Sequence, residues 1–216
     1  GREPVAATGW MGHYLIVFVY VDVTRHFSVR YTYLGPWEGE GLAGYDETAR
    51  VWEQFNGAFV VVYPPQRAAA VAAALGPALA DEATMWARAV ERARAAARAR
   101  PDDAFAWFNL GSGLTALARG DDAALAVDAA AAFDEARRLG LPARMLWYQF
   151  APYEAYLAAG RPEDVLVLAA ATLQSQGGRN VEETYLYQGQ ALRLLGDEDG
   201  AQAALARAAE LKARGQ

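Results

Sequence analysis

The chain has 216 residues, with 20 Lys and Arg against 26 Asp and Glu, a formal net charge of −6 and no cysteine. A net acidic chain lacks the basic surface that a phosphate backbone requires, so we expect no nucleic-acid partner. The lack of cysteine excludes disulfides and thiolate zinc sites, and there are only two histidines, so we expect no metal and no cofactor. With 54% apolar residues the sequence is too hydrophobic for a disordered chain.

The apolar run from Tyr14 to Val21 is far shorter than the ~20 residues that a membrane helix needs, so it predicts a buried strand and no membrane span. The chain begins at Gly1 instead of Met, which we interpret as removal of upstream residues. A processed N-terminus favours an extracytoplasmic location, although the sequence does not define the compartment.

The first 65 residues are rich in aromatic and β-branched residues, which favour strands. They predict a small β-β-α-β unit, with Asp46 as the N-cap of its helix. The expected elements are a strand from His13 to Val21, a strand from Phe27 to Leu34, a glycine-rich loop over 35–44, a helix from Asp46 to Phe55 and a strand from Ala58 to Tyr63.

Alanine dominates after Pro64-Pro65, and glycine or proline interrupts the sequence every fifteen to twenty residues. This spacing predicts antiparallel helices. The fold class is therefore α+β, with linking and capping helices over 66–100 and three helix pairs over 101–216. Fixed offsets around Ala118, Gly160 and Gly196 place similar residues at equivalent positions, which indicates an internal repeat.

The runs Trp107-Phe108-Asn109-Leu110-Gly111 and Leu195-Gly196-Asp197 resemble the tetratricopeptide repeat, over about residues 85–213. The resemblance implies a helical solenoid in which Gly111 and Gly189 allow the two helices of a pair to approach closely. The middle pair departs from the pattern, because Tyr153 stands at the small-residue position. An alanine-rich bundle without repeats is the alternative.

A solenoid of this kind presents a concave face, lined by the first helix of each pair, to a protein or peptide partner. Its end nearer the N-terminus is aromatic and its other end is polar. As alternatives, several of these aromatic residues belong to the inter-helix core, or the chain's own N-terminal unit fills the face. The expected peptide-binding residues are Phe105, Phe108, Ser112, Trp147, Phe150, Glu154, Leu186, Gln190 and Arg193.

Gly12-His13-Tyr14 and, after a turn, Tyr33-Leu34-Gly35-Pro36 resemble the C-terminal half of a bacterial papain-like, bacteriocin-processing cysteine peptidase, over about residues 9–65. The resemblance implies that His13 stands at the position of the general base. The family's acidic residue is replaced by Tyr31, and no cysteine is present to act as nucleophile. We therefore expect no enzyme activity from this chain and treat His13 as vestigial.

Together these patterns predict a non-catalytic scaffold that binds a protein or peptide, a pseudoenzyme by descent. Two alternatives remain at this point. One is half of a split or truncated peptidase whose cysteine lies elsewhere. The other is a structural subunit of a cell-envelope assembly, in which strand edges such as Ala58 to Tyr63 pair with neighbours. Self-association is left open.

Overall fold

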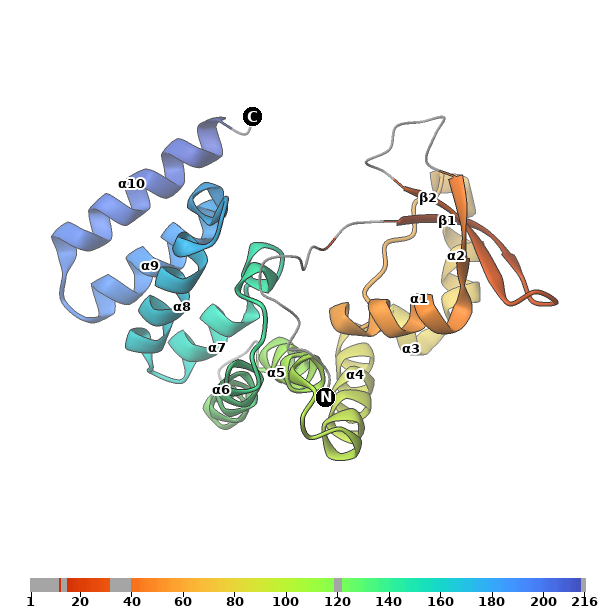
Figure 1. The fold of residues 1–216 in the computed structure, drawn as a ribbon, viewed down its shortest axis with the longest axis horizontal. Helices are drawn as coiled ribbons and strands as arrows, with labels where there is room; N and C mark the ends of the chain where they lie inside the picture. The colour runs from red at the N-terminus through yellow and green to blue at the C-terminus, as the bar shows by residue number, and fades with distance from the viewer. Residues whose placement is uncertain (1–11, 13–14, 32–39, 119–121, 215–216) are drawn as a thin grey trace. The chain divides into compact units, whose positions relative to one another are not determined.

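A computed structural model of the chain describes residues 12, 15–31, 40–118 and 122–214, except the side chains of Tyr31 and Ala80 (Figure 1). A three-stranded antiparallel sheet is followed by helices, which is the α+β layout that the sequence predicts. The chain divides into two compact units with the boundary between Val62 and Tyr63, close to the predicted boundary at residue 65. We call them the sheet unit and the helical unit.

The sheet unit is built on a hairpin of β1 (Leu15–Val21) and β2 (His26–Tyr31), as the alternation of the sequence predicts. The third strand, β3 (Glu40–Gly44), pairs antiparallel with β2, so the strand order is β1-β2-β3. β1 is therefore an edge strand of the sheet.

A bulge in β1 decides which of its side chains share a face. Val17 pairs with Val29 but Val19 pairs with Ser28, so Phe18 is an extra residue. Because side chains alternate along a strand, the register assigns the residues of β1 to two faces. Leu15, Val17 and Tyr20 share the face of Phe27 and Val29, and Ile16, Val19 and Val21 share the opposite face.

The predicted β-β-α-β order is wrong, because the third strand precedes the helix. Residues 40–44 form β3 inside the expected loop, and residues 58–63 carry no secondary structure. Glycine disfavours strands in general, but here Gly41 lies opposite Val29, which is fully buried. An apolar, β-branched segment such as Ala58 to Tyr63 becomes a strand only where a neighbouring strand accepts its hydrogen bonds.

The predicted helix is present as α1 (Tyr45–Trp52), followed by the 3-10 helix η1 (Glu53–Phe55). Asp46 is not its N-cap. Gly44 holds that position without a side-chain hydrogen bond, and Asp46 lies in the first turn, 2.7 Å from the guanidinium of Arg25. Phe27 contacts the ring of Tyr45 at a centroid distance of 4.4 Å, so the Phe27 face of the sheet turns toward α1.

The helical unit begins with short elements and continues with longer helices, which end at the predicted glycine and proline breaks. Its elements are η2 (Pro65–Arg67), α2 (Ala68–Leu75), α3 (Pro77–Ala80), α4 (Glu82–Ala99), α5 (Ala104–Leu117), α6 (Ala123–Arg138), η3 (Ala143–Trp147), α7 (Ala151–Ala158), α8 (Pro162–Gln174), η4 (Gly178–Asn180), α9 (Glu182–Leu194) and α10 (Glu198–Arg214).

Aspartates cap the start of four of the longer helices, and before α10 Asp197 accepts a hydrogen bond from the Gly200 amide at 2.9 Å. Asp81 accepts a hydrogen bond from the Thr84 amide at 2.8 Å, and Asp103 accepts one from the Phe105 amide at 3.0 Å. Asp122 accepts from two amides at the start of α6, both at 3.1 Å. Each cap satisfies amides that the helix itself leaves without an acceptor.

The middle pair is shorter than the repeat frame predicts. Its first helix, α7, has eight residues, and the segment before it is the 3-10 helix η3. Pro152 accounts for this start, since proline fits the first turn of a helix but lacks the amide hydrogen that an earlier start would require.

Candidate peptide-binding surface

The helices of the helical unit pack in a regular order. α5 packs on α6 and α9 packs on α10, while α6 packs on α7 and α8 on α9. The first helices are also in contact with one another, α5 with α7 and α7 with α9 (Figure 1). α7 therefore lies between α5 and α9, the three helices to which the predicted peptide-binding residues were assigned.

Aromatic rings join α7 to α9. Tyr153 stacks on Tyr187 with centroids 5.1 Å apart and rings 8° from parallel, and Phe150 lies 6.2 Å from the same ring. The Tyr187 hydroxyl donates to Glu154 Oε1 at 3.0 Å. The structure thus brings the predicted residues Phe150 and Glu154 together around a residue that the sequence did not single out.

The internal repeat in the sequence did not single out Tyr187. The equivalent positions, nine residues before Gly160 and Ala118, hold Ala151 and Asn109. An aromatic residue found in only one of three repeats is not visible as a pattern. The contact depends on the close approach of α7 and α9.

The predicted residues of α9 lie along one exposed stripe of the helix. Leu186 and Gln190 are four residues apart and Arg193 follows three residues later, a spacing that places side chains on one face. Leu186 is 40% exposed, a large fraction for a leucine. The Arg193 guanidinium lies 3.7 Å from Glu198 Oε2, at the start of α10.

The predicted peptide-binding residues of α5 are less exposed to a partner than those of α9. Phe108 is 2% exposed and packs edge-on against Phe133 of α6, with centroids 5.4 Å apart. The Ser112 hydroxyl donates to the Phe108 carbonyl oxygen at 2.9 Å, and Phe105 is half-buried. The core alternative therefore holds for Phe108.

Trp147 packs against the turn that follows α8. Its indole N–H donates to Ser175 Oγ at 3.1 Å, and the Arg144 guanidinium lies 4.7 Å from its ring centroid. A Cβ on Gly177 would come within 2.7 Å of the indole, so this glycine leaves room for the ring. These contacts place Trp147 beside the turn between α8 and η4.

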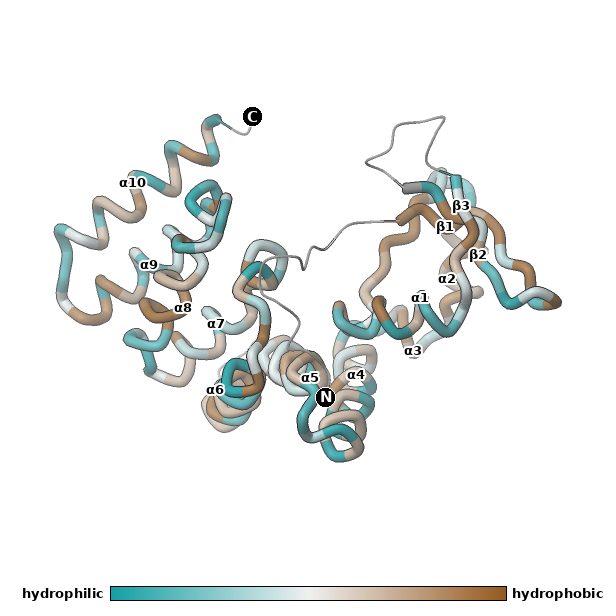
Figure 2. Tube along the Cα trace, in the orientation of Figure 1, coloured by the Kyte–Doolittle hydropathy of each residue, from teal (hydrophilic) through white to brown (hydrophobic). Residues whose placement is uncertain are grey.

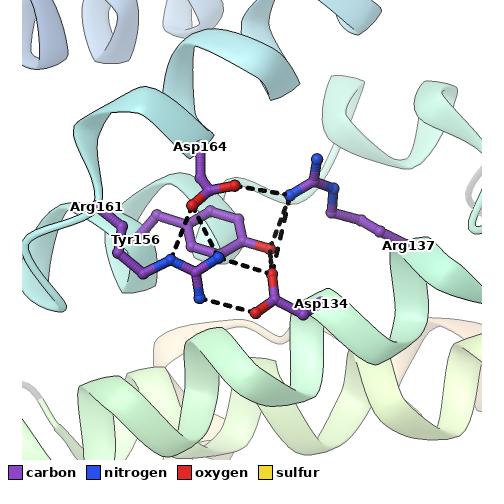
Figure 3. Close-up of polar contacts among 5 residues, drawn as sticks. All are labelled: Asp134, Arg137, Tyr156, Arg161 and Asp164. Atoms are coloured by element: carbon purple, nitrogen blue, oxygen red, sulfur yellow. Dashed lines mark hydrogen bonds and ion pairs between the residues drawn. The ribbon is translucent and has the colours of Figure 1, made fainter.

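A charged cluster that the sequence analysis missed joins α6, α7 and α8 (Figure 3). Asp134 Oδ2 is 2.7 Å from Arg161 Nη1, and Asp164 Oδ2 is 2.8 Å from Arg161 Nε. Arg137 Nη1 lies 3.3 Å from Asp164 Oδ1 and donates to the Tyr156 hydroxyl at 3.2 Å. That hydroxyl donates to Asp134 Oδ1 at 2.7 Å.

The two arginines and two aspartates of this cluster balance in charge. Partial burial would raise the pKa of Asp134, but hydrogen bonds from Arg161 and Tyr156 hold it below its usual range. Burial raises the pKa of Tyr156 to about 12. A hydrogen-bonded cluster that has no net charge and contains a protonated phenol is typical of a structural contact between helices. The spacing Asp134–Arg137 and Arg161–Asp164, three residues in each case, is the only trace of it in the sequence.

A cavity of about 190 Å³ lies beside the cluster, between α6 and α8. Its walls are mostly apolar, with Phe133 and Leu168 among them, and Arg137 supplies the polar edge.

The structure does not describe the side chains of the two residues that the resemblance to a peptidase singled out. His13 lies outside the described residues. Tyr31 ends β2 opposite Leu15, and its side chain is not described. Among residues 12, 15–31, 40–118 and 122–214, no group of three or more His, Asp or Glu could hold a metal ion. No helix in the described part of the chain has the length and hydrophobicity to cross a membrane.

Comparison with known proteins found no match to any family model, curated protein or solved structure. The functional argument therefore depends on the packing and chemistry described above.

Proposed function

We propose that the helical unit is a tetratricopeptide-like scaffold that binds a protein or peptide, without catalysis, on the surface formed by α5, α7 and α9. The order of helix contacts carries this proposal. Each helix packs on the next, and first helices also touch the first helices of neighbouring pairs. That pattern is the one expected of stacked helix pairs.

Small residues support the repeat assignment where the sequence predicted them. A Cβ on Gly111 would lie 2.8 Å from ring carbons of Phe133, and a Cβ on Gly189 would lie 2.7 Å from Leu205 Cγ. Both glycines therefore stand at a close contact between the two helices of a pair. In the middle pair, the larger Tyr153 is fully buried and its hydroxyl lies 3.0 Å from Thr172 Oγ1 of α8.

The chemistry of the surface favours a peptide with both apolar and polar side chains. Leu186 and Phe150 supply apolar contact, while Glu154, Gln190 and Arg193 supply hydrogen-bonding groups. We name these five residues the α7–α9 patch. Apolar anchors surrounded by polar groups are the usual composition of a protein-binding surface.

A random peptide library displayed on phage tests the proposal. Peptides selected on the wild-type chain are measured by fluorescence polarisation against Leu186→Ala and Gln190→Ala. We expect the affinity for these variants to fall by about tenfold, equivalent to ~1.4 kcal/mol, with unchanged helical circular dichroism.

Val127→Ala is the matched control, because Val127 is a 56% exposed aliphatic residue on α6, outside the first helices. The proposal fails if the chain selects no peptide, or if Val127→Ala weakens binding as much as Leu186→Ala does.

A further inference from the structure

One carboxylate of the α7–α9 patch has no cation beside it. Glu154 is half-buried, and in the described part of the chain its side chain has one polar partner, the Tyr187 hydroxyl, which donates to Oε1 at 3.0 Å. A partly buried charge is normally paired, because burial removes it from water. Four other half-buried carboxylates of the helical unit each lie within 3.3 Å of an arginine nitrogen: Asp103, Asp134, Glu135 and Asp164.

The hydrogen bond from Tyr187 fixes the position of the Glu154 carboxylate. Glu154 lies in the first turn of α7, where the free amides of the helix favour negative charge, but its Oε1 bonds to a side chain of α9. The one arginine of α9, Arg193, lies about 9 Å further along the helix axis than Tyr187 and pairs with Glu198. Glu154 Oε2 can therefore accept a hydrogen bond from a partner.

Aromatic rings lie beside this carboxylate. Tyr153 stacks on one face of the Tyr187 ring at a centroid distance of 5.1 Å, and Phe150 lies 6.2 Å away with its plane tilted by 31°. Phe150 and Tyr187 are both half-buried, so part of each ring stays exposed. The face of an aromatic ring attracts a cation that lies within about 6 Å of its centroid. A carboxylate beside such rings favours a cation over an anion or a neutral group.

The neighbouring residues of α9 suit the rest of a basic side chain. Glu183 stands one helical turn before Tyr187 and has no ion pair in the described part of the chain, so it adds negative charge to this side of α9. In Figure 2 α9 carries both hydrophilic and hydrophobic residues, and among the latter Leu186 is 40% exposed. Lysine and arginine match this mixture, because their aliphatic stems pack on apolar surface while their charged ends bind a carboxylate.

We infer that the partner of the α7–α9 patch is a peptide with a basic side chain, lysine or arginine, which donates to Glu154 Oε2 and lies against the rings of Phe150 and Tyr187. This inference rests on the proposed function and names the chemistry of its partner. Tyr187 is a positioning residue, since its hydroxyl holds the carboxylate. The two basic residues differ in geometry, because a planar guanidinium stacks on a ring whereas an ammonium group is a compact charge.

Peptides selected from the phage library provide the first test. Each is synthesised with lysine, arginine or the neutral norleucine at the position of its basic residue, and binding is measured by fluorescence polarisation. We expect the wild-type chain to bind the better basic form at least about tenfold more tightly than norleucine. Tighter binding of arginine than of lysine would show that stacking on the rings contributes, and the reverse order would show that the carboxylate dominates. Selected peptides without a basic residue, or equal binding of the three forms, overturn the inference.

Glu154→Gln removes the charge and keeps an oxygen that accepts from the Tyr187 hydroxyl. We expect this variant to prefer the basic forms over norleucine by about twofold or less, with unchanged helical circular dichroism. Glu163→Gln is the matched control, because Glu163 is exposed in the first turn of α8, outside the first helices, and this variant should retain the full preference. An equal loss of preference in both variants would indicate attraction to the net charge of −6 and would overturn the inference.

The failure of this inference is distinguishable from the failure of the proposed function. A chain that selects no peptide overturns both. Peptides that bind wild-type protein, lose affinity for Leu186→Ala and bind equally well with norleucine overturn the preference for a basic side chain alone, and leave the binding surface in place.

Discussion

Two buried threonines contact the middle helix pair in different ways. Thr172 Oγ1 lies 3.0 Å from the Tyr153 hydroxyl and donates to the Leu168 carbonyl oxygen at 3.1 Å. Thr184 is also fully buried, and its hydroxyl acts on the pKa of the same Tyr153 hydroxyl, but the geometry of a normal hydrogen bond is not reached with any group that the structure describes. The Thr172 hydroxyl is therefore well hydrogen-bonded and the Thr184 hydroxyl is not, so we expect the two to contribute differently to stability.

Valine substitution separates these two roles, because valine has nearly the shape of threonine without its hydroxyl. We expect Thr184→Val to raise the free energy of unfolding by about 1 kcal/mol, since it removes an unsatisfied polar group. Thr172→Val should lower it by about 1–3 kcal/mol, since the buried Tyr153 hydroxyl loses its partner. Urea denaturation followed by circular dichroism measures both. Equal loss of stability in the two variants would contradict the assignment.

At the scale of elements, the charged cluster connects α6, α7 and α8, and the Tyr156 hydroxyl at its centre stays protonated at neutral pH. The pKa of Tyr156 is raised to about 12 in the folded chain, while the pKa of an exposed tyrosine is about 10. Between these values the unfolded chain loses the phenolic proton and the folded chain retains it. The contribution of Tyr156 is therefore complete below about pH 10 and is lost as the pH rises toward 12.

Tyr156→Phe removes this titration. We expect the wild-type chain to be more stable than the variant at pH 8, and the difference to shrink by about 2 kcal/mol between pH 10 and pH 12. Denaturant titrations of both proteins at each pH provide the measurement, and effects of other titrating groups cancel in the difference. A difference that stays constant over this range would show that the Tyr156 hydroxyl is not buried as the structure describes.

Helix positions were more predictable from the sequence than strand positions. Glycine and proline mark the helix ends because they act locally, through backbone conformation and the missing amide hydrogen. β3 was missed because Gly41 and Ala43 favour a strand only when they lie opposite the bulky Val29 and Phe27. The charged cluster and Tyr187 were missed for a related reason, since both depend on contacts between helices distant in the sequence.

At the scale of the whole molecule, the two compact units are joined through a segment without secondary structure. Residues 58–64 follow η1, and Val60 and Val62 are 81% and 93% exposed. Exposed, irregular segments are preferred sites of proteolysis. We expect a protease specific for apolar residues to cut first within 59–62.

The fragment that remains should begin near Tyr63 and keep its helical circular dichroism, because α4 packs directly on α5. Intact-mass measurement during limited digestion identifies the first cut. A first cut near Pro101 that releases α2, α3 and α4 would instead show that these helices are a separate linking segment, and that the stable part begins at α5.

The internal repeat in the sequence predicted which helices carry the proposed binding residues, but not how deeply each residue is buried. Glu154 lies on α7 and Phe150 is its N-cap residue, while α9 carries Leu186, Gln190 and Arg193. Phe108 follows the same frame but is buried against Phe133. Periodicity places a residue on a face of its helix, whereas the depth at which that face is buried depends on the size of its neighbours.

The bulge at Phe18 has a consequence for changes in chain length. Val17 and Val19 already lie opposite adjacent residues of β2, so deleting Phe18 would leave every other pair of the hairpin in register. Deleting another residue inside β1 would shift part of the strand by one position and exchange its two faces. The hairpin therefore has one internal position at which a single-residue deletion preserves its pairing.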